Sequence, residues 1–403
     1  MKFSYQIVKG ETNMNTNRNR WGRLAISLVV VLGAAGICGA WGKAPDFNRG
    51  KAPNLNCGKA PDFKGMPWDW RNHKETTPSF FVGGFNVPGN VLISDQFNNR
   101  VIEVNPCTGD IVWSFGSNDP NLCNPGPGAI IGPNWAERIS NGLTLIAGTG
   151  IPAGVDPALP DGCVDNRVIV VDKDGNIVWQ YGQAGVTGSD PNQLNVPVAA
   201  IQLPNGNFLI TDQGNNRIIE VNHKKQIVWS YGPTSGPGAL NGPNSAEQLN
   251  NRHILIADQS NNRVIEITRD GTIVWEYDAG LNTAAFASRL PDGNTMIVDA
   301  GNARIIIVTP DKQVAFEYFT NTSSDSNPDP LPTNAVMLKS GEIIIADQFN
   351  NRVFAINPLM QIIWQYGITN VVGNGPGQLN GPYTAFVIGD YTGQTPPPMF
   401  GGY

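Results

Sequence analysis

Histidine is scarce in this chain of 403 residues, which contains only His73, His223 and His253. None of the three has the spacing of a metal-binding motif such as H-x-H or H-E-x-x-H. A G-x-S-x-G nucleophile elbow and a glycine-rich phosphate loop are also absent. The sequence therefore identifies no catalytic residue and no metal ligand. Calcium, held by carboxylates from scattered loops, is the one cofactor that this composition leaves open.

Charged residues are also sparse, at 15% of the chain. The first 40 residues contain 5 of the 27 Lys and Arg and 1 of the 33 Asp and Glu, so residues 41–403 have 22 basic and 32 acidic side chains and a net charge of −10. A negative surface repels nucleic acid and anionic lipid. We therefore expect no nucleic-acid partner.

Long apolar runs are limited to residues 24–40, which follow Arg18, Arg20 and Arg23 and end in small residues. This order is typical of a secretory signal, and 17 residues is short for a spanning helix, which needs about 20. We expect residues 1–40 to be a cleaved signal and the protein to be secreted, periplasmic or held at the cell surface. The alternative is an uncleaved anchor, which would make the membrane a partner.

Glycine and proline, in contrast, are abundant, with 46 and 31 residues. Short runs of Val, Ile, Trp and Tyr alternate with Gly, Pro and Asn clusters, a pattern typical of a turn-rich β protein. A helical bundle or an α/β dehydrogenase is excluded, and the apolar fraction of 40% allows a large core.

One segment repeats along most of the chain. LISDQFNNRVIEVNPCTGDIVWSFG (92–116) has close copies at 208–232, 254–278 and 343–367, and diverged copies at 143–182 and 295–318. The arginine after Asn-Asn recurs at intervals of 41 to 50 residues, with one of 67. Three strands in each copy and one upstream strand make a four-stranded propeller blade. The fold prediction is thus all-β, a single β-propeller over residues 66–390.

Small residues mark the innermost strand of each blade, and an aromatic-x-aromatic pair marks the outermost strand. We count seven inner strands, ending with Ala385, and seven outer strands if Trp68 is included. This count predicts seven blades, the last shared between the two chain ends so that no sheet edge is exposed. Six blades are the alternative. Residues 41–65, with three copies of G-K-A-P, are expected to be an extended tether, and residues 391–403 a C-terminal tail.

The repeats resemble NHL-repeat propellers, through D-x-x-N-N-R-I/V and the G-P-G-x-L-N-G-P connectors at 236–243 and 375–382. They are also similar to repeats of arylsulfotransferase-like and quinone-type propellers. These families host lyases, hydrolases, sulfotransferases and binding modules on one scaffold, so the resemblance implies the fold more than a chemistry.

An aspartate lies five residues before the repeat arginine in five copies, across a tight hairpin. Repetition favours a structural Asp–Arg clamp over a metal site, because a site is usually asymmetric. The residues concerned are Asp95, Arg100, Asp212, Arg217, Asp258, Arg263, Asp299, Arg304, Asp347 and Arg352.

The second blade departs from the repeat with an insertion of about 17 residues at 149–166, which places Gly162 where the repeat aspartate is expected. Loops of this length are often functional. If the chain binds a ligand there, its candidates are Asp156, Asp161 and Asp165. The alternative is a surface elaboration held by a disulfide bond.

Four cysteines follow the signal, an even number that suggests two disulfide bonds in an exported chain. In a propeller, the hairpin between the second and third strands and the connectors between blades open on one face. Cys123 and Cys163 lie on such segments, whereas Cys107 is expected on the opposite face. Cys57 shares that opposite face if Trp68 marks the outer strand of the shared blade. We therefore predict the pairs Cys123–Cys163 and Cys57–Cys107.

Three functions fit these features. The first is a non-catalytic exported scaffold that binds a protein or glycan partner. The alternative is an enzyme, a metal-dependent hydrolase, lyase or sulfotransferase-like protein with its site at the axis mouth. The third is a surface or filament subunit assembled through the tether.

Overall fold

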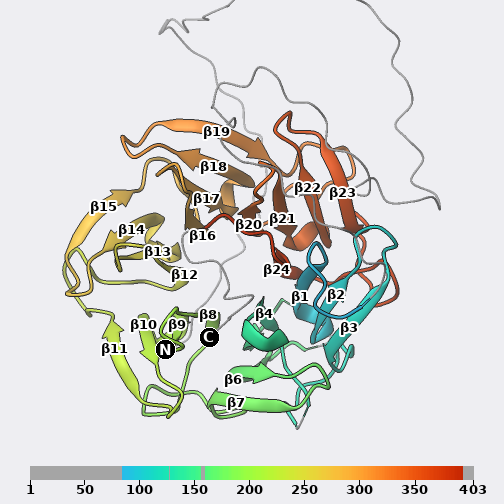
Figure 1. The fold of residues 1–403 in the computed structure, drawn as a ribbon, viewed down its shortest axis with the longest axis horizontal. Coiled ribbons are helices and arrows are strands. Elements are labelled where there is room, and N and C mark those ends of the chain that lie inside the picture. Colours follow the sequence, from blue (N-terminus) through green and yellow to red (C-terminus); the bar gives the residue numbers. More distant parts are fainter. Residues whose placement is uncertain (1–83, 127, 156–158, 394–403) are drawn as a thin grey trace, which may run out of the picture. The chain divides into compact units, whose positions relative to one another are not determined.

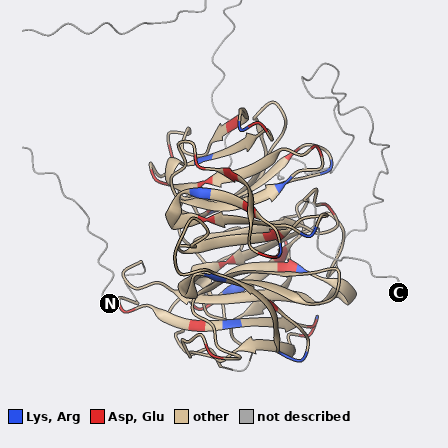
Figure 2. Cartoon of the chain, turned by 90° about the vertical axis from the view of Figure 1, so that its left-hand side faces the viewer, with Lys and Arg blue, Asp and Glu red and all other residues tan. Residues whose placement is uncertain are grey.

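The structure is a computed structural model that describes residues 84–126, 128–155 and 159–393. These residues form six four-stranded antiparallel sheets arranged as blades around an axis (Figure 1). Seen from the side, acidic and basic residues are interspersed along the strands and loops of the ring (Figure 2). The all-β propeller prediction is confirmed, with the six-blade alternative.

Four strands make up each blade, in order from the innermost to the outermost. Blade 1 contains β24 (Pro382–Val387), β1 (Val91–Asp95), β2 (Arg100–Val104) and β3 (Ile111–Gly116). Blade 2 contains β4 (Pro133–Arg138), β5 (Thr144–Ile151), β6 (Cys163–Val171) and β7 (Ile177–Gly182). Blade 3 contains β8 (Pro197–Gln202), β9 (Phe208–Asp212), β10 (Arg217–Val221) and β11 (Ile227–Tyr231).

The remaining blades follow the same order. Blade 4 contains β12 (Pro243–Gln248), β13 (Ile254–Asp258), β14 (Arg263–Ile267) and β15 (Ile273–Tyr277). Blade 5 contains β16 (Ala284–Arg289), β17 (Thr295–Asp299), β18 (Arg304–Val308) and β19 (Val314–Phe319). Blade 6 contains β20 (Pro332–Met337), β21 (Ile343–Asp347), β22 (Arg352–Ile356) and β23 (Ile362–Gly367).

Single turns of 3-10 helix join strands within the blades. Five of them follow the second strand of a blade, and one lies between β4 and β5. They are η1 (Gln96–Asn98), η2 (Ser140–Gly142), η3 (Gln213–Asn215), η4 (Gln259–Asn261), η5 (Ala300–Asn302) and η6 (Gln348–Asn350).

The ring closes in blade 1, where the last strand of the chain completes a sheet that begins with the first. β24 pairs antiparallel with β1, with Ala385 opposite Ile93. The prediction of seven blades is therefore wrong. The count of seven assigned an inner strand at Gly83 to blade 1. The strand around Ala385 was then left over and was assigned to a further blade. Gly83 and Trp68 lie outside the described residues.

Small residues occupy the crowded position nearest the axis in all six inner strands. Each one lies opposite an isoleucine of the second strand, with Ala136 opposite Ile146 as one example. The three inner strands of each blade are almost entirely buried on both faces, because the neighbouring blades pack against them, whereas the outermost strand is partly exposed. Alternating apolar residues, the pattern that predicted the strands, thus fill the interfaces between blades.

A buried ion pair holds the hairpin between the second and third strands of each blade. In five blades the aspartate Oδ2 accepts from the arginine Nε at 2.6–2.8 Å. In four of these, the aspartate Oδ1 also accepts a backbone N–H of the preceding connector, as from Asn195 to Asp212 at 2.8 Å. The pair therefore fastens each hairpin to the connector that leads into its blade.

Blade 2 builds the same clamp from a different residue. Strand pairing places Gly148, not Gly162, opposite Arg167. Asp165 supplies the carboxylate from β6, with Oδ1 2.5 Å from Arg167 Nε, and Oδ2 accepts the Ile131 N–H at 2.7 Å. A Cβ at Gly148 would lie 2.9 Å from the Asp165 carboxyl carbon. A glycine there makes room for a carboxylate that arrives from the partner strand.

Two more hydrogen bonds recur between neighbouring blades. The asparagine before the repeat arginine accepts a backbone N–H of the next connector in five of six junctions, at 2.7–2.9 Å. The outer-strand tryptophan donates its indole N–H to a turn carbonyl of the next blade, also in five of six. These tryptophans therefore pack against the neighbouring blade.

The junction between blades 5 and 6 lacks all three of these bonds. Ala303 stands where the other blades have asparagine, Pro330 supplies no N–H, and Phe316 replaces tryptophan. Asp347 Oδ1 is buried without a hydrogen-bond partner in the described part of the chain. A cavity of about 60 Å³ lies between the two blades, lined in part by Phe316, Asn357 and Pro358. We call this junction the 5/6 seam.

Candidate functional site

The two faces of the ring differ in the segments that they display. The hairpins η1 and η3–η6 and the connectors between blades share one face, as backbone bonds such as Phe97 N–H to Asn380 carbonyl show. The other face has short turns between the first and second strands and between the third and fourth strands. We call them the connector face and the turn face.

Exposed apolar side chains on the connector face are concentrated in one part of the ring. Val155 and Val164 lie on the insertion of blade 2, and Val372 is 62% exposed on connector 368–381. Val186, Ile368 and Val371 lie in the same part of the ring. Outside it, Phe319 is 40% exposed at the connector end of β19 in blade 5. Connectors 232–242, 278–283 and 320–331 present no exposed large apolar side chain. The apolar half of the connector face therefore lies over blades 6, 1 and 2.

A small apolar core lies beneath this half. Phe97 of η1 and Phe349 of η6 stack with ring centroids 6.5 Å apart. The corresponding residues of blades 3, 4 and 5 are Gly214, Ser260 and Gly301. Four residues of this core are buried, with Leu122, Leu159 and Phe349 packed against them: Phe97, Ile131, Ile151 and Cys163. We call these seven residues the connector-face cluster.

Glycine is required where the cluster meets the closing connector. Gly381 has a φ of +61°, and a Cβ there would lie 2.4 Å from the Phe97 ring. The ring of Phe97 thus lies directly on the backbone that leads into β24.

A disulfide bond fixes the insertion of blade 2 to connector 117–132. Cys123 and Cys163 are bonded, with their Cα atoms 5.3 Å apart, so this predicted pair is confirmed. Cys57 lies outside the described residues, and the pair Cys57–Cys107 stays a prediction. A structural disulfide bond indicates an oxidising compartment. In the described part of the chain, no helix is long and apolar enough to span a membrane.

The three aspartates predicted for the insertion do not form one site. Asp161 is exposed on the loop, whereas Asp165 is fully buried in the clamp of blade 2. Asp156 lies outside the described residues. The pKa of Asp165 is raised by burial, while Arg167 and the Ile131 N–H oppose that shift. Its two oxygens are both engaged, so Asp165 is part of the scaffold.

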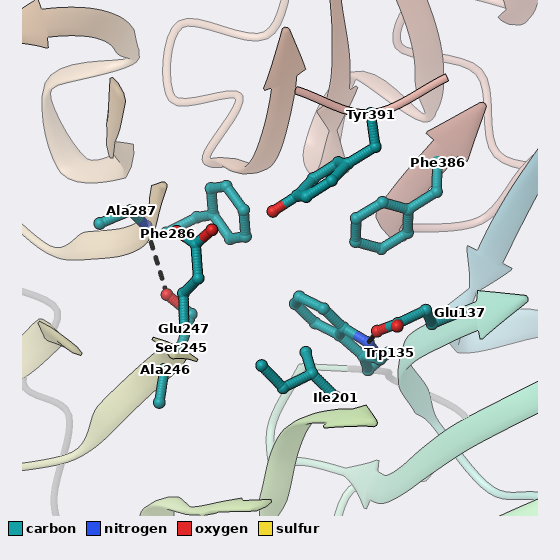
Figure 3. Close-up of a pocket in the computed structure, with 10 residues that line it drawn as sticks. All are labelled: Trp135, Glu137, Ile201, Ser245, Ala246, Glu247, Phe286, Ala287, Phe386 and Tyr391. Carbon is teal, nitrogen blue, oxygen red and sulfur yellow. Dashed lines mark hydrogen bonds between the residues drawn. The ribbon is translucent and has the colours of Figure 1, made fainter. Parts of the chain in front are cut away.

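A second candidate site lies on the axis, where inner strands of five blades meet (Figure 3). The cavity is about 10 Å³, room for about one water-sized group. Glu137 of β4 and Glu247 of β12 reach it from different blades. Its aromatic walls are Trp135, Phe286, Phe386 and Tyr391.

Amide side chains fill the axis nearer the connector face. Gln348 Nε2 donates to Gln96 Oε1 at 2.7 Å, and Gln213 Nε2 donates to Asn244 Oδ1 at 3.1 Å. The hydroxyl of Tyr383 donates to the same Asn244 oxygen at 2.9 Å, and burial raises the pKa of Tyr383 to about 12. The glutamine after the repeat aspartate thus links neighbouring hairpins around the axis.

Sequence reasoning did not identify the residues of the axial cavity. A signal was present, because a glutamate follows the small inner-strand residue in only two blades, at Ala136-Glu137 and Ala246-Glu247. Phe97 and Phe349 were visible in the same way, as bulky residues at a repeat position that is otherwise small. Among the described residues, no group of three or more His, Cys, Asp or Glu is placed to hold a metal ion.

No protein-family model and no curated protein matches the chain. Several solved structures are similar. A protein of unknown function from Bacteroides caccae is 14% identical, and the match covers 74% of this chain and 98% of that one with a TM-score of 0.53. Virginiamycin B lyase from Staphylococcus aureus is 16% identical, with coverages of 70% and 81% and a TM-score of 0.47. The WD40 propeller domain of Doa1 is 9% identical, with coverages of 64% and 71% and a TM-score of 0.42. At these identities the likeness concerns the β-propeller fold alone.

Proposed function

We propose that this protein is an exported, NHL-like β-propeller that acts as an interaction module for a protein partner. The partner binds the apolar half of the connector face, over blades 6, 1 and 2. The observation that carries the proposal is asymmetry within a repeated scaffold. Six blades share one clamp, yet exposed valines and stacked phenylalanines gather over three of them.

Three properties of this surface support a protein partner. Apolar side chains rimmed by polar loops are typical of protein-binding surfaces. The disulfide bond and the stacked phenylalanines hold the loops in place, so little conformational entropy is lost on binding. Clustering also distinguishes this set from single exposed apolar residues, which are common on any protein surface.

Export is the second part of the proposal. It is supported by the disulfide bond and by the signal-like pattern in residues 1–40. The tether at 41–65 would then separate the ring from the cell surface or from an anchor.

Site-specific photo-crosslinking tests the binding surface. We expect a photoreactive amino acid in place of Val372 to form one discrete adduct in the cells that produce the protein. The same group in place of Val274, an exposed valine on outer strand β15, should form none. The double substitution Val155→Asp and Val371→Asp should reduce the Val372 adduct about tenfold or more, the effect of losing one or two interface hot spots.

The design separates binding from folding, because all four valines are exposed and surface changes usually alter stability by about 0.5 kcal/mol or less. Equal adduct yields from positions 372 and 274 would contradict the proposal, as would an adduct that the double substitution leaves unchanged.

A further inference from the structure

We propose that the axial cavity binds a primary ammonium group, carried by a small alkylamine or by a lysine side chain of a partner. This site is separate from the connector face and does not depend on the function proposed above. The proposal rests on the size of the cavity, the buried carboxyl group of Glu137 that faces it and its aromatic walls.

The size of the cavity selects the class of ligand. With room for about one water-sized group, it excludes a sugar ring, a quinone or a nucleotide. An –NH3+ group is close to water in size and carries three hydrogen-bond donors. Only the ammonium head fits the cavity, so its alkyl stem must leave it toward the turn face, where Tyr391 lies.

Glu137 is the group that most clearly needs a cation. Its side chain is buried at 2% exposure, and Trp135 Nε1 donates to Oε2 at 3.2 Å. Nothing else in the described structure bonds to this carboxyl group, and none of the described residues that line the cavity is a Lys, Arg or His. A carboxylate in such a place is strongly disfavoured unless a cation joins it.

The arginines near the cavity, Arg138 and Arg289, form ion pairs with other acidic residues. Arg138 donates to Glu103 at 2.6 Å, and Arg289 donates to Glu266 at 2.9 Å. Glu247, the second acid of the cavity, accepts the backbone N–H of Arg289 at 2.9 Å. The charge of the arginine side chains is therefore directed away from the axis.

Aromatic rings complete the site. Trp135 lies 5.1 Å from Phe386 and 6.2 Å from Phe286 between ring centroids, and Tyr391 lies 6.1 Å from Phe386. Ring faces attract cations, most strongly when both are desolvated. Calcium, in contrast, takes six to eight oxygen ligands, and walls of aromatic carbon do not supply them.

Protonation gives the site a distinctive pH dependence. Burial raises the pKa of Glu137 to about 8, so the empty site is mostly protonated at pH 7. Burial and the nearby Glu247 also raise the pKa of Tyr391, which stays neutral. Binding of an ammonium group favours the ionised carboxyl, so a proton is released below about pH 8. Affinity should rise with pH up to that value and fall only when the amine itself loses its proton, near pH 10.

Calorimetry with methylammonium chloride tests the site, with sodium chloride as the ionic control. We expect saturable 1:1 binding to the full chain and, at pH 7, proton release measured in buffers of different ionisation enthalpy. Glu137→Gln should weaken binding about tenfold or more, the loss of one charge-assisted hydrogen bond, and abolish the proton release. Glu276→Gln, an acid on the outer strand β15, should change neither.

A second arm separates the two sources of the ammonium group. A lysine whose α-amino and carboxyl groups are blocked should bind at least as tightly as methylammonium if the mouth at Tyr391 admits a partner's side chain. Binding of methylammonium alone would restrict the site to small amines. Absence of saturable binding of either probe, or equal affinity of the Glu137→Gln protein, would overturn the proposal.

Discussion

Replacing Arg100 by leucine is expected to lower the free energy of unfolding by about 3–5 kcal/mol, the cost of leaving a buried charge without its partner. Arg100 pairs with the fully buried Asp95 at 2.7 Å and donates to the carbonyls of Asn374 and Gln378 at 3.1 Å. The substitution therefore leaves the Asp95 carboxylate without its partner. It also removes two hydrogen bonds to connector 368–381, which leads into β24. Urea denaturation at pH 7 measures the change.

Two controls define the cause of this loss. Lys173→Ala removes an exposed pair with Asp174 and should cost less than about 1 kcal/mol. The double substitution Asp95→Asn and Arg100→Leu removes both charges and should recover part of the stability lost by Arg100→Leu. If Asp95→Asn instead lowered the stability of the Arg100→Leu protein further, the two losses would be independent. The unpaired Asp95 carboxylate would then not be the cause of the first loss.

Repairing the 5/6 seam is expected to stabilise the protein by about 2 kcal/mol in a double variant, at about 1 kcal/mol for each of two new hydrogen bonds. Ala303→Asn restores an amide that can accept the Leu331 N–H, and Pro330→Asn restores a backbone donor for Asp347. Ala303 also has a φ of +54°, a left-handed conformation that asparagine adopts more readily than alanine. Thermal unfolding should shift upward by several degrees.

The neighbouring junction supplies a matched control for the seam. Asn262 accepts the Thr283 N–H at 2.7 Å between blades 4 and 5, so Asn262→Ala creates the defect that Ala303→Asn removes. The two substitutions should change stability by similar amounts and in opposite directions. Loss of stability in both would show that asparagine at position 303 does not make the repeated bond.

The gain from Pro330→Asn alone should depend on pH. Burial raises the pKa of Asp347 from 3.8 to about 6. Arg352, Asn350 and Thr320 act in the opposite direction and lower this pKa. The phenol of Tyr318 also lies close to the pair of Asp347 and Arg352. Because the pKa of Asp347 is higher in the folded protein than in the unfolded chain, protonation of Asp347 stabilises the fold. This contribution is fully present below about pH 4 and is lost as the pH rises through about 6. A new N–H donor to the ionised carboxylate lowers the pKa. The variant should therefore gain stability at pH 7 and little at pH 4, as urea denaturation at the two pH values would measure.

Much of the scaffold was predictable because its repeats encode local geometry. Asp-Gln-x-Asn-Asn-Arg places two polar residues five apart across a hairpin, and this spacing brings Asp258 and Arg263 directly opposite each other. The tryptophans and the disulfide Cys123–Cys163 followed from the same periodicity. In each case the relevant partners lie at repeat positions, so one copy explains the others.

The errors arose where a residue's partner depends on pairing that the repeat does not encode. Gly83 has the spacing of an inner strand, yet β24 takes that position from the far end of the chain. In blade 2, Gly150 and Ile151 pair with Val164 and Cys163, so the strands lengthen. The position of the repeat aspartate, which is opposite the arginine, therefore falls on Gly148. Counting five residues back from Arg167 leads to Gly162 instead.

The axial cavity is harder still to predict from sequence, since it is formed mainly by residues from five different inner strands. Glu137 and Glu247 are 110 positions apart, and only closure of the ring brings them to one space. Their burial, which gives the site its chemistry, is a property of the assembled ring and not of either strand.

Closure by β24 also sets the order of events during synthesis. The inner strand of the first blade is the last one made, so β1, β2 and β3 must wait as a three-stranded sheet with an open edge while five blades form. Joining Ile93 to Ala385 then closes a loop of nearly the whole ring, a long-range contact of the kind that slows folding. Until that contact forms, the β24 strand of one molecule can complete the open sheet of another. Dimers exchanged through this strand are therefore the misassembled form to which this ring is most exposed.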